Sequence, residues 1–384
     1  WACAALALPL VAQPRLDAVV DAAALDAARP LAAGAWASVF GADLAPRVEA
    51  ASAVPLPTSL AGSRVLVGGV PAALSFVAPG QVNFLVPFGT ALGAVEFVVE
   101  SSGVRSAGLA RQVAAAAPAL FTLTASGSGP PAVIRPDGSR PSPSSPVRPG
   151  EILLVFANGL GPVDRTQAPG APAGADPLAR LASTPAVLFD GAPAEVLFAG
   201  LAPGFVSLYQ LNVRVPESLS KPFPELSVRA GGASSNAGAV GGPGVLSISP
   251  TIAASSRAVT LVLRGFNFSA NSLLSIANGL LPGRWTPGVV EEFAVDLPDT
   301  FLGGSGFLSV TAVEPDVGGA VAGNFVRLDV ALPDSLSLET REVSLNTGAC
   351  ASSEPAAELE LRSSAPVPAP LRLQWSGAPW LDVE

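Results

Sequence analysis

Ser218 and Lys221 stand at the Ser-x-x-Lys spacing that penicillin-interacting enzymes use. In those enzymes the serine is a nucleophile at the start of a helix, and Ser-Asp-Asn and Lys-Thr-Gly motifs complete the site. Here the pair follows Pro216 in a predicted turn, and neither further motif follows it. We therefore interpret the match as a coincidence.

The other residue types that carry chemistry are too sparse or too scattered to form a site. The chain has no histidine, which excludes His-dependent triads and imidazole metal sites. Cys3 and Cys350 are the two cysteines, too few for a thiolate zinc site or a disulfide scaffold. Asp164 and Asp176 flank a loop rich in Pro and Gly, which lacks the EF-hand pattern of a calcium site. We therefore predict no enzyme activity, no catalytic residue, and no cofactor or metal site.

Two pairs of amides recur at equivalent positions, Gln81 with Asn83 and Gln210 with Asn212. Recurrence suggests ligand binding. However, an amide on a strand beside a Pro-Gly turn can also satisfy loop backbone groups that would otherwise be buried unpaired. We favour this second, structural role.

The aromatic residues that could stack on sugars occur singly. Sandwich cores routinely bury one large ring, so we expect the tryptophans in cores rather than on a sugar platform. Tyr209, the single tyrosine, is expected at a sheet edge. Residues 267–269 match the glycosylation sequon, to which we give no weight in a chain taken as bacterial. The tryptophans concerned are Trp36, Trp285, Trp375 and Trp380.

Composition indicates a folded chain that is not mainly helical. Of its 384 residues, 49% are hydrophobic and 13% charged, which excludes general disorder. The 39 Gly and 39 Pro exclude a mainly helical protein, because both residues destabilise helix interiors. The net charge of −9, with no cluster of basic residues, excludes a nucleic-acid partner.

An internal repeat organises the first two-thirds of the chain. Three blocks recur in the same order, with residues 34–46, 67–72 and 81–87 matching 150–162, 189–194 and 210–216. Within the blocks apolar and polar residues alternate, which predicts strands with one buried face. Residues 68–69 and 190–191 have the positive-φ types of a tight hairpin turn, and Pro87 and Pro216 are expected to end strands. The fold class predicted is all-β, with tandem immunoglobulin-like β-sandwich modules.

We divide the chain into five segments. Residues 1–14 are expected to be the remnant of a secretory signal peptide, since an apolar run there ends in small residues; Cys3 leaves a lipid anchor open. Residues 15–125 and 126–243 are the two sandwich repeats, with 17–28 as an extended lead-in and 126–146 as a junction containing a small hairpin. Residues 244–332 form a third sandwich, and 333–384 a partial fourth.

The repeated blocks carry shared Gly, Pro and amide positions across residues 20–240. They resemble a domain family of acidobacterial exported proteins, the Solibacter uncharacterised C-terminal domain. That family has no established activity, so the resemblance implies an architecture and export but no reaction. The matching positions are Gly34, 40–41, Leu44, 55–57, 69–72, 79–83 and 86–87 in the first copy, and 159–162, 199–204 and 209–216 in the second.

The remaining segments resemble other immunoglobulin-like modules. Residues 248–250 and 265–268 are similar to the opening strands of the TIG/IPT domain, which indicates such a domain over residues 245–333. Trp380 and Leu381 are similar to part of the BACON carbohydrate-associated module, which implies a partial module over residues 334–384.

These observations favour an exported multi-module protein with a structural or adhesive role at the cell surface. It would bind protein or polysaccharide without catalysis, through loops presented by rigid sandwiches. One alternative is an accessory carbohydrate-binding array of an extracellular enzyme whose catalytic domain lies beyond Glu384. The other is a hydrolase that uses carboxylates. No segment approaches the length of a membrane span, and the fold alone does not choose among these functions.

Overall fold

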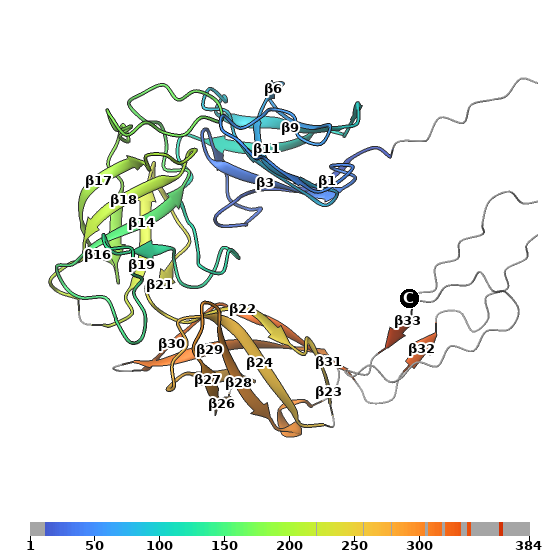
Figure 1. Ribbon diagram of the computed structural model, residues 1–384, viewed down its shortest axis with the longest axis vertical. Coiled ribbons are helices and arrows are strands. Elements are labelled where there is room, and N and C mark those ends of the chain that lie inside the picture. The colour runs from blue at the N-terminus through green and yellow to red at the C-terminus, as the bar shows by residue number, and fades with distance from the viewer. Residues whose placement is uncertain are drawn as a thin grey trace, which may run out of the picture.

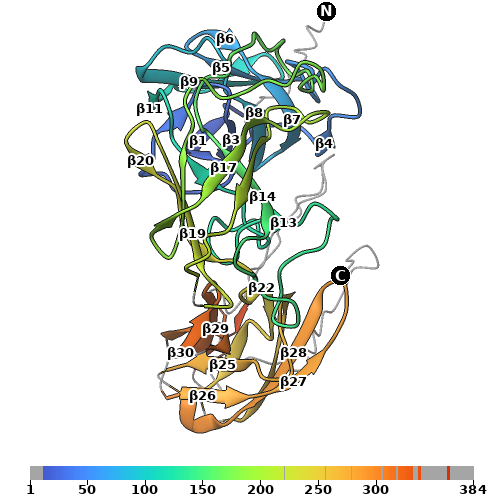
Figure 2. The same ribbon diagram turned by 90° about the vertical axis from the view of Figure 1, so that its left-hand side faces the viewer.

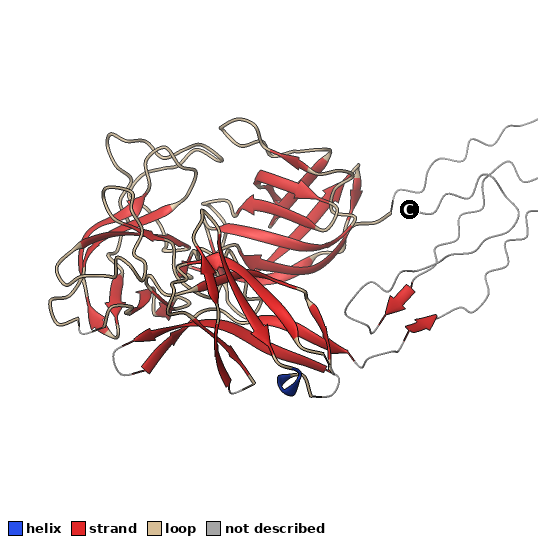
Figure 3. Cartoon of the chain, turned by 60° about the horizontal axis from the view of Figure 1, so that its bottom comes forward, coloured by secondary structure: helices blue, strands red, loops and turns tan. Residues whose placement is uncertain are grey.

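The computed structural model describes residues 12–331, except 220, 256, 278, 304–305 and 317–318, together with residues 336–338 and 361–363. The regular secondary structure of the described chain is almost entirely β-strand, and its one helical element is the short turn η1 (Asp299–Phe301). Figure 3 shows this turn in blue at the lower edge of the red strands, and in Figure 2 residues 244–331 lie below the rest of the described chain. The prediction of tandem immunoglobulin-like β-sandwiches is thus confirmed. In Figure 1 the first unit lies beside the second, and the third lies below them.

The first unit packs two sheets on each other, and its strand pairs are antiparallel except β2 with β11. One sheet has the order β1 (Arg15–Asp21), β3 (Trp36–Ala42), β8 (Gln81–Leu85), β7 (Ala73–Ala78) and β4 (Glu49–Ala50). The other has the order β2 (Leu31–Ala32), β11 (Leu109–Ala114), β9 (Gly93–Ser101), β5 (Ser63–Val67) and β6 (Val70–Pro71), with β10 (Val104–Arg105) paired to β9.

The second unit repeats this design. Its first sheet has the order β12 (Ala119–Leu120), β14 (Ile152–Asn158), β18 (Tyr209–Arg214) and β17 (Glu195–Leu201), with β13 (Val133–Ile134) paired to β14. Its second has the order β16 (Ala192–Pro193), β15 (Ala186–Phe189), β19 (Glu225–Ala230) and β20 (Ala233–Ser234), with β21 (Gly238–Ala239) also paired to β19.

Local details of the two copies also correspond. A bulge interrupts the pairing of β7 with β8 between Leu74 and Phe76, and another interrupts β17 with β18 between Val196 and Phe198. The predicted hairpin turns are present, because the two residues at 68–69 and at 190–191 all have positive φ. Strand β8 ends at Leu85 and β18 at Arg214, each two residues before the proline expected to stop it.

The third unit is another sandwich. One sheet has the order β22 (Gly244–Ser249), β24 (Val259–Phe266), β28 (Glu291–Leu297) and β27 (Arg284–Thr286). The other has the order β23 (Ile252–Ala254), β31 (Val326–Ala331), β29 (Gly306–Asp316), β25 (Leu273–Ile276) and β26 (Gly279–Pro282), with β30 (Gly319–Ala322) paired to β29. Beyond it, β32 (Leu336–Leu338) pairs with β33 (Leu361–Ser363). The rest of the predicted fourth module lies outside the described residues, as does nearly all of the predicted signal remnant.

The structure refines three expectations about the segments. Residues 119–120, which we assigned to the first repeat, form β12 and pair with β14 of the second, so that unit begins earlier than residue 126. The small hairpin expected in the junction is also part of the second unit, because β13 pairs with β14. The extended lead-in predicted over residues 17–28 ends at Asp21, whose carboxylate accepts hydrogen bonds from the backbone of Ala23 and Ala24 and bends the chain.

Each unit closes its own hydrophobic core, and the three cores are separate. In the first, Phe84 from one sheet meets Phe97 from the other, with ring centroids 6.0 Å apart and the rings tilted by 59°. Both rings are fully buried. Such a pair combines the burial of two large apolar surfaces with a favourable tilted ring geometry.

We expect the substitution Phe84→Ala to destabilise the protein by about 3–5 kcal/mol, since it removes a buried ring and leaves a cavity. Guanidinium unfolding followed by circular dichroism measures the loss. The control is Phe205→Ala, which deletes a ring that is 58% exposed and should change the free energy of unfolding by less than about 0.5 kcal/mol. Equal losses in the two variants would contradict this assignment of the core.

Candidate functional site

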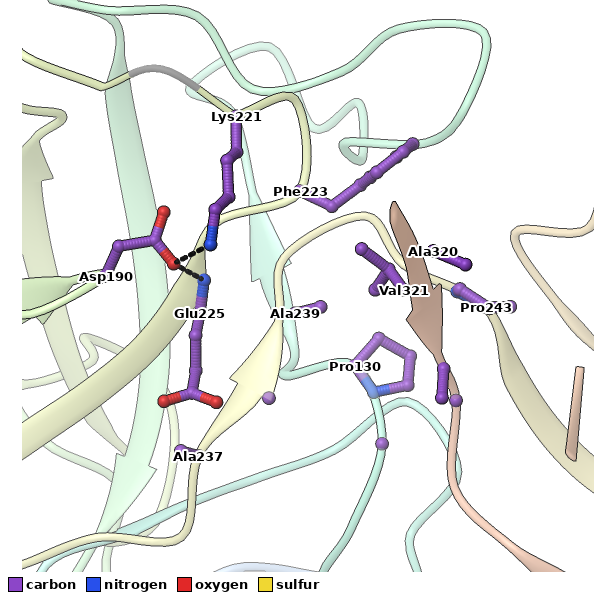
Figure 4. Close-up of a pocket in the computed structure, with 14 residues that line it drawn as sticks. Pro130, Asp190, Lys221, Phe223, Glu225, Ala237, Ala239, Pro243, Ala320 and Val321 are labelled. Carbon is purple, nitrogen blue, oxygen red and sulfur yellow. Dashed lines mark hydrogen bonds and ion pairs between the residues drawn. The ribbon is translucent and has the colours of Figure 1, made fainter. Parts of the chain in front are cut away.

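A cleft of about 680 Å³ lies between the second and third units (Figure 4). Its two walls include the strands β21 and β30, each of which has one strand partner among the described residues. Small side chains dominate the lining, so main-chain groups are close to the cleft surface. The lining residues are Gly129, Pro130, Asp190, Lys221, Phe223, Glu225, Ala237, Gly238, Ala239, Pro243, Ala320, Val321, Ala322 and Gly323.

The charged groups of the cleft come from one wall. Asp190 accepts a hydrogen bond from the backbone N–H of Glu225 at 3.1 Å, and its carboxylate lies 3.7 Å from Nζ of Lys221. The side chain of Lys221 is 52% exposed, so this ion pair contributes at most about 1 kcal/mol to stability. Figure 4 shows the carboxylate of Glu225 pointing away from Asp190. The Asp190 carboxylate thus joins the β15–β16 turn to β19.

The Ser-x-x-Lys match does not form a nucleophile site in this arrangement. Ser218 is exposed in a turn after β18, where the backbone N–H of Leu219 donates to Pro216 O at 3.2 Å. Lys221 is directed to Asp190 in the cleft instead. The serine therefore lacks the helix start that this chemistry requires.

The recurring amides bond to each other and not, as expected, to loop backbone. Nε2 of Gln81 donates to Oδ1 of Asn83 at 2.8 Å, and Nε2 of Gln210 donates to Oδ1 of Asn212 at 2.7 Å. In the first copy the hydroxyl of Ser38 also donates to Asn83. Residues two apart on a strand share a face, so each pair lies along the polar face of its sheet. The amide pairs therefore recur because both copies have the same strand with the same polar face.

Three aromatic expectations were wrong. Tyr209 is fully buried on β18, between β14 and β17 rather than at an edge, and its hydroxyl donates to Gly161 O at 2.7 Å. Burial raises the pKa of this phenol. Trp36 lies at the contact between the first two units, and its indole donates to Val206 O at 2.9 Å. Trp285 is 37% exposed on β27. Trp375 and Trp380 lie outside the described residues.

The remaining candidate polar residues form backbone contacts. Oδ1 of Asp164 accepts from the N–H of Arg180 at 3.0 Å, while Asp176 is exposed. Asn267 of the sequon is buried, and its amide donates to Gly242 O at 3.0 Å, so the glycan acceptor nitrogen is enclosed. Within the described ranges, no three His, Cys, Asp or Glu residues are grouped so that they could hold a metal ion. Nor does any helix in these ranges have the length and apolar character needed to cross a membrane.

Sequence reasoning missed a fully buried polar side chain that makes three hydrogen bonds, Asn158 at the end of β14. Its Oδ1 accepts from Trp36 N at 2.9 Å, and its Nδ2 donates to Trp36 O at 2.8 Å and to Oδ2 of Asp21 at 2.7 Å. Asn158 belongs to the second unit, whereas Asp21 and Trp36 belong to the first. Comparison of the two copies could have singled out Asn158, because the equivalent position in the first copy is Ala42 and the amide is therefore not required by the repeat itself. We call these three residues the joint.

Apart from the joint, apolar contacts and further hydrogen bonds link the first two units. Ser207 donates to Gly34 O, and the N–H of Leu56 donates to Gly170 O at 2.8 Å. Ala32, Ala35 and Ala117 form a small buried cluster beside it. Phe88, which follows β8 of the first unit, packs against the core of the second. The first two units are therefore held in one orientation by buried contacts.

Burial raises the pKa of Asp21 above its ordinary value of 3.8, because the ionised carboxylate loses its hydration. Hydrogen bonds from Ala24, Ala23 and Asn158, and the charge of Arg29, oppose this shift. Desolvation is the larger effect. The folded protein therefore holds the proton of the Asp21 carboxyl more tightly than the unfolded chain does.

We expect Asn158→Asp to destabilise the protein by about 3–5 kcal/mol, because a buried charge would replace a donor that Asp21 and Trp36 require. Chemical unfolding measures the loss. Asn212→Asp is the matched control, since Asn212 is half-buried on the polar face of β18. A loss of less than about 1 kcal/mol in Asn158→Asp would show that the joint does not hold the units.

The raised pKa of Asp21 predicts a sign for the pH dependence of stability. A carboxyl that binds its proton more tightly when folded adds stability as pH falls through its folded pKa toward 3.8. The difference in free energy of unfolding between wild type and Asp21→Asn should therefore shift in favour of wild type as the pH is lowered from 7 toward 3.8. A shift in favour of the variant over that interval would mean that the pKa is lowered.

No protein-family model matches the sequence, and curated proteins give no match either. Among solved structures, the full extracellular region of plexin A4 is 11% identical, with 85% of this chain and 25% of that chain covered and a TM-score of 0.20. The SGBP-B protein of the Bacteroides ovatus mixed-linkage glucan utilization locus, in complex with a mixed-linkage heptasaccharide, is 12% identical, covers 75% and 64%, and scores 0.23. The I9–I11 tandem from titin is 8% identical, covers 81% and 96%, and scores 0.15. The chain thus spans a quarter of the plexin region and under two-thirds of SGBP-B, and these scores indicate nothing about its function.

Proposed function

We propose that this chain is a structural or adhesive segment of an exported cell-surface protein, which binds protein or polysaccharide without catalysis. The observation that carries the proposal is the joint, where Asn158 bonds Asp21 and Trp36 across two sandwiches. Buried hydrogen bonds fix the relative orientation of the two repeats, since breaking them would leave polar groups unpaired away from water. A rigid tandem presents its loops at fixed spacing, which suits a scaffold or an adhesin.

The polar groups of the cleft support the same proposal. Asp190 is bonded to the backbone of Glu225 and paired with Lys221, and most of the remaining lining residues are small. A surface of this kind can contact a macromolecule through main-chain groups. Two converging carboxylates, as a glycosidase requires, are not brought together there, because Glu225 points away from Asp190.

Trp285 favours a second candidate, an accessory carbohydrate-binding array. The indole is 37% exposed on β27, at the end of the β22–β24–β28–β27 sheet. Exposed aromatic rings offer apolar area with a polar edge, a combination that interaction surfaces favour. In this candidate the third unit would bind glycan for an enzyme domain elsewhere in the protein.

Solution scattering and a polysaccharide assay test the proposal together. The scattering curve of the purified chain should fit one fixed arrangement of the first two units. Incubation with insoluble cellulose, chitin and xylan should release no reducing ends. Retention on one of these polymers that Trp285→Ala weakens at least tenfold would favour the carbohydrate-binding array.

Two outcomes would overturn the structural role. The first is a scattering curve that requires freely reorienting repeats, and the second is release of reducing ends from any of the polymers. Phe307→Ala serves as the control for Trp285→Ala, because it removes a 61% exposed ring from the other sheet of the third unit.

A further inference from the structure

Two arginines line a second pocket, of about 380 Å³, on the first unit. Arg111 lies on β11 next to Gln112, and Arg29 lies in the segment between β1 and β2. Both arginines are partly buried. The other lining residues are small or apolar and carry no charge: Ala27, Ala28, Pro30, Ala94 and Ala110.

Both guanidinium groups bond to backbone carbonyls. Nη2 of Arg111 donates to Arg29 O at 2.8 Å, and Nη1 donates to Ala27 O. Nη2 of Arg29 donates to Pro118 O at 2.7 Å and to Ser234 O. The bonds of Arg111 hold it against the segment that carries Arg29, and the bonds of Arg29 hold it against Pro118 and against Ser234 of the second unit. A carbonyl oxygen accepts a hydrogen bond but does not neutralise the positive charge.

No ion pair among the described residues includes Arg29 or Arg111. Elsewhere on this acidic chain, arginines such as Arg135 and Arg284 face carboxylates at 2.9 and 2.8 Å. Nε of Arg111 is buried and has no hydrogen-bond partner in the described structure. The pocket therefore has two held positive charges, neither of which is paired with a carboxylate among the described residues.

The two carboxylates nearest to Arg29 in the sequence are already bonded elsewhere. Asp21 is buried in the joint, where it accepts bonds from Ala23, Ala24 and Asn158. Asp26 accepts from the N–H of Ala28 at 2.8 Å. Their negative charge lowers the potential at Arg29, but neither carboxylate lines the pocket.

We propose that this pocket binds an anionic sugar residue of an extracellular polysaccharide through its carboxylate or sulfate group. Guanidinium forks match the planar oxygens of a carboxylate and bind sulfate oxygens by the same donors. The amide of Gln112 can bond a sugar hydroxyl, and the pocket volume is within the range of small-ligand sites. The inference rests on the proposed binding role and adds the chemical class of the ligand.

The net charge of −9 limits the kind of polysaccharide that can bind. A densely charged polyanion would be repelled by the chain as a whole, whereas one acidic residue among neutral sugars meets only the local field of the two arginines. The site should therefore prefer sparse acidic groups, and its affinity should fall as salt is added.

Isothermal titration tests the site on the full chain with three probes: an oligosaccharide carrying one galacturonate, the same oligosaccharide with one sulfate ester, and its neutral analogue. We expect binding of the acidic probes at least tenfold tighter than of the neutral one. Arg29→Gln should weaken that binding at least tenfold, and Arg29→Lys should weaken it less. Preference for the galacturonate or the sulfate probe identifies the group recognised.

Two further variants separate recognition from folding. Arg64→Gln, which removes an exposed arginine on β5 of the same unit, should leave the affinity unchanged. Asp26→Asn keeps the oxygen that accepts from Ala28 and removes a negative charge beside Arg29, so it should tighten binding several-fold. A gain of affinity cannot result from misfolding.

Equal affinity for acidic and neutral probes would overturn the inference, as would an equal loss in Arg29→Gln and Arg64→Gln. Neither result touches the proposed structural role, which scattering and the reducing-end assay decide separately. Circular dichroism and thermal unfolding of each variant confirm that the compared chains are folded.

Discussion

The structure depends on one constraint, that polar groups buried between two sandwiches must bond to each other. Asp21 and Asn158 are almost completely enclosed, and the backbone of Trp36 lies between them. A buried carboxylate without partners would be far too costly to retain. The bonds that satisfy it run across the contact between the repeats, so satisfying the carboxylate also fixes the orientation of the two units.

Comparison of the two repeats explains why each contributes different groups to this contact. Both copies share the hairpin turns, the bulges and the amide pairs along the central strand. They differ at the joint, where the second copy has Asn158 and the first has Ala42. One copy therefore supplies the amide, and the other supplies the carboxylate and the backbone of Trp36 at the start of β3, so the two surfaces complement each other.

Partner groups also determine where positive charge on the described surface is neutralised. Several basic side chains form an ion pair with a carboxylate, as Lys221 does with Asp190 and Arg135 with Glu151. Arg29 and Arg111 differ, because the hydrogen bonds of their guanidinium groups in the described structure all go to carbonyl oxygens. On an acidic chain, an unneutralised pair of this kind is the feature most suited to an anionic ligand.

Much of the fold could be predicted from the sequence. The alternation of apolar residues in β8, β18 and β24 and the turn types at Gly68 and Asp190 depend on neighbours within a few residues, so the pattern was sufficient to predict strands, turns and repeat. The functions of single polar and aromatic residues were not predictable in this way. Tyr209 and Trp36 were placed wrongly, and Asn158 was missed.

The physical reason is the range of the interactions concerned. Strand periodicity and hairpin turns are local, so the sequence by itself determined a chain of tandem sandwiches. The bond from Asn158 to Asp21 and the meeting of Arg111 with the carbonyl of Arg29 join residues far apart in the chain. Only the packing of whole sheets brings those groups together, and so only the tertiary structure decided where charge is buried, where it is neutralised and where it remains open to a ligand.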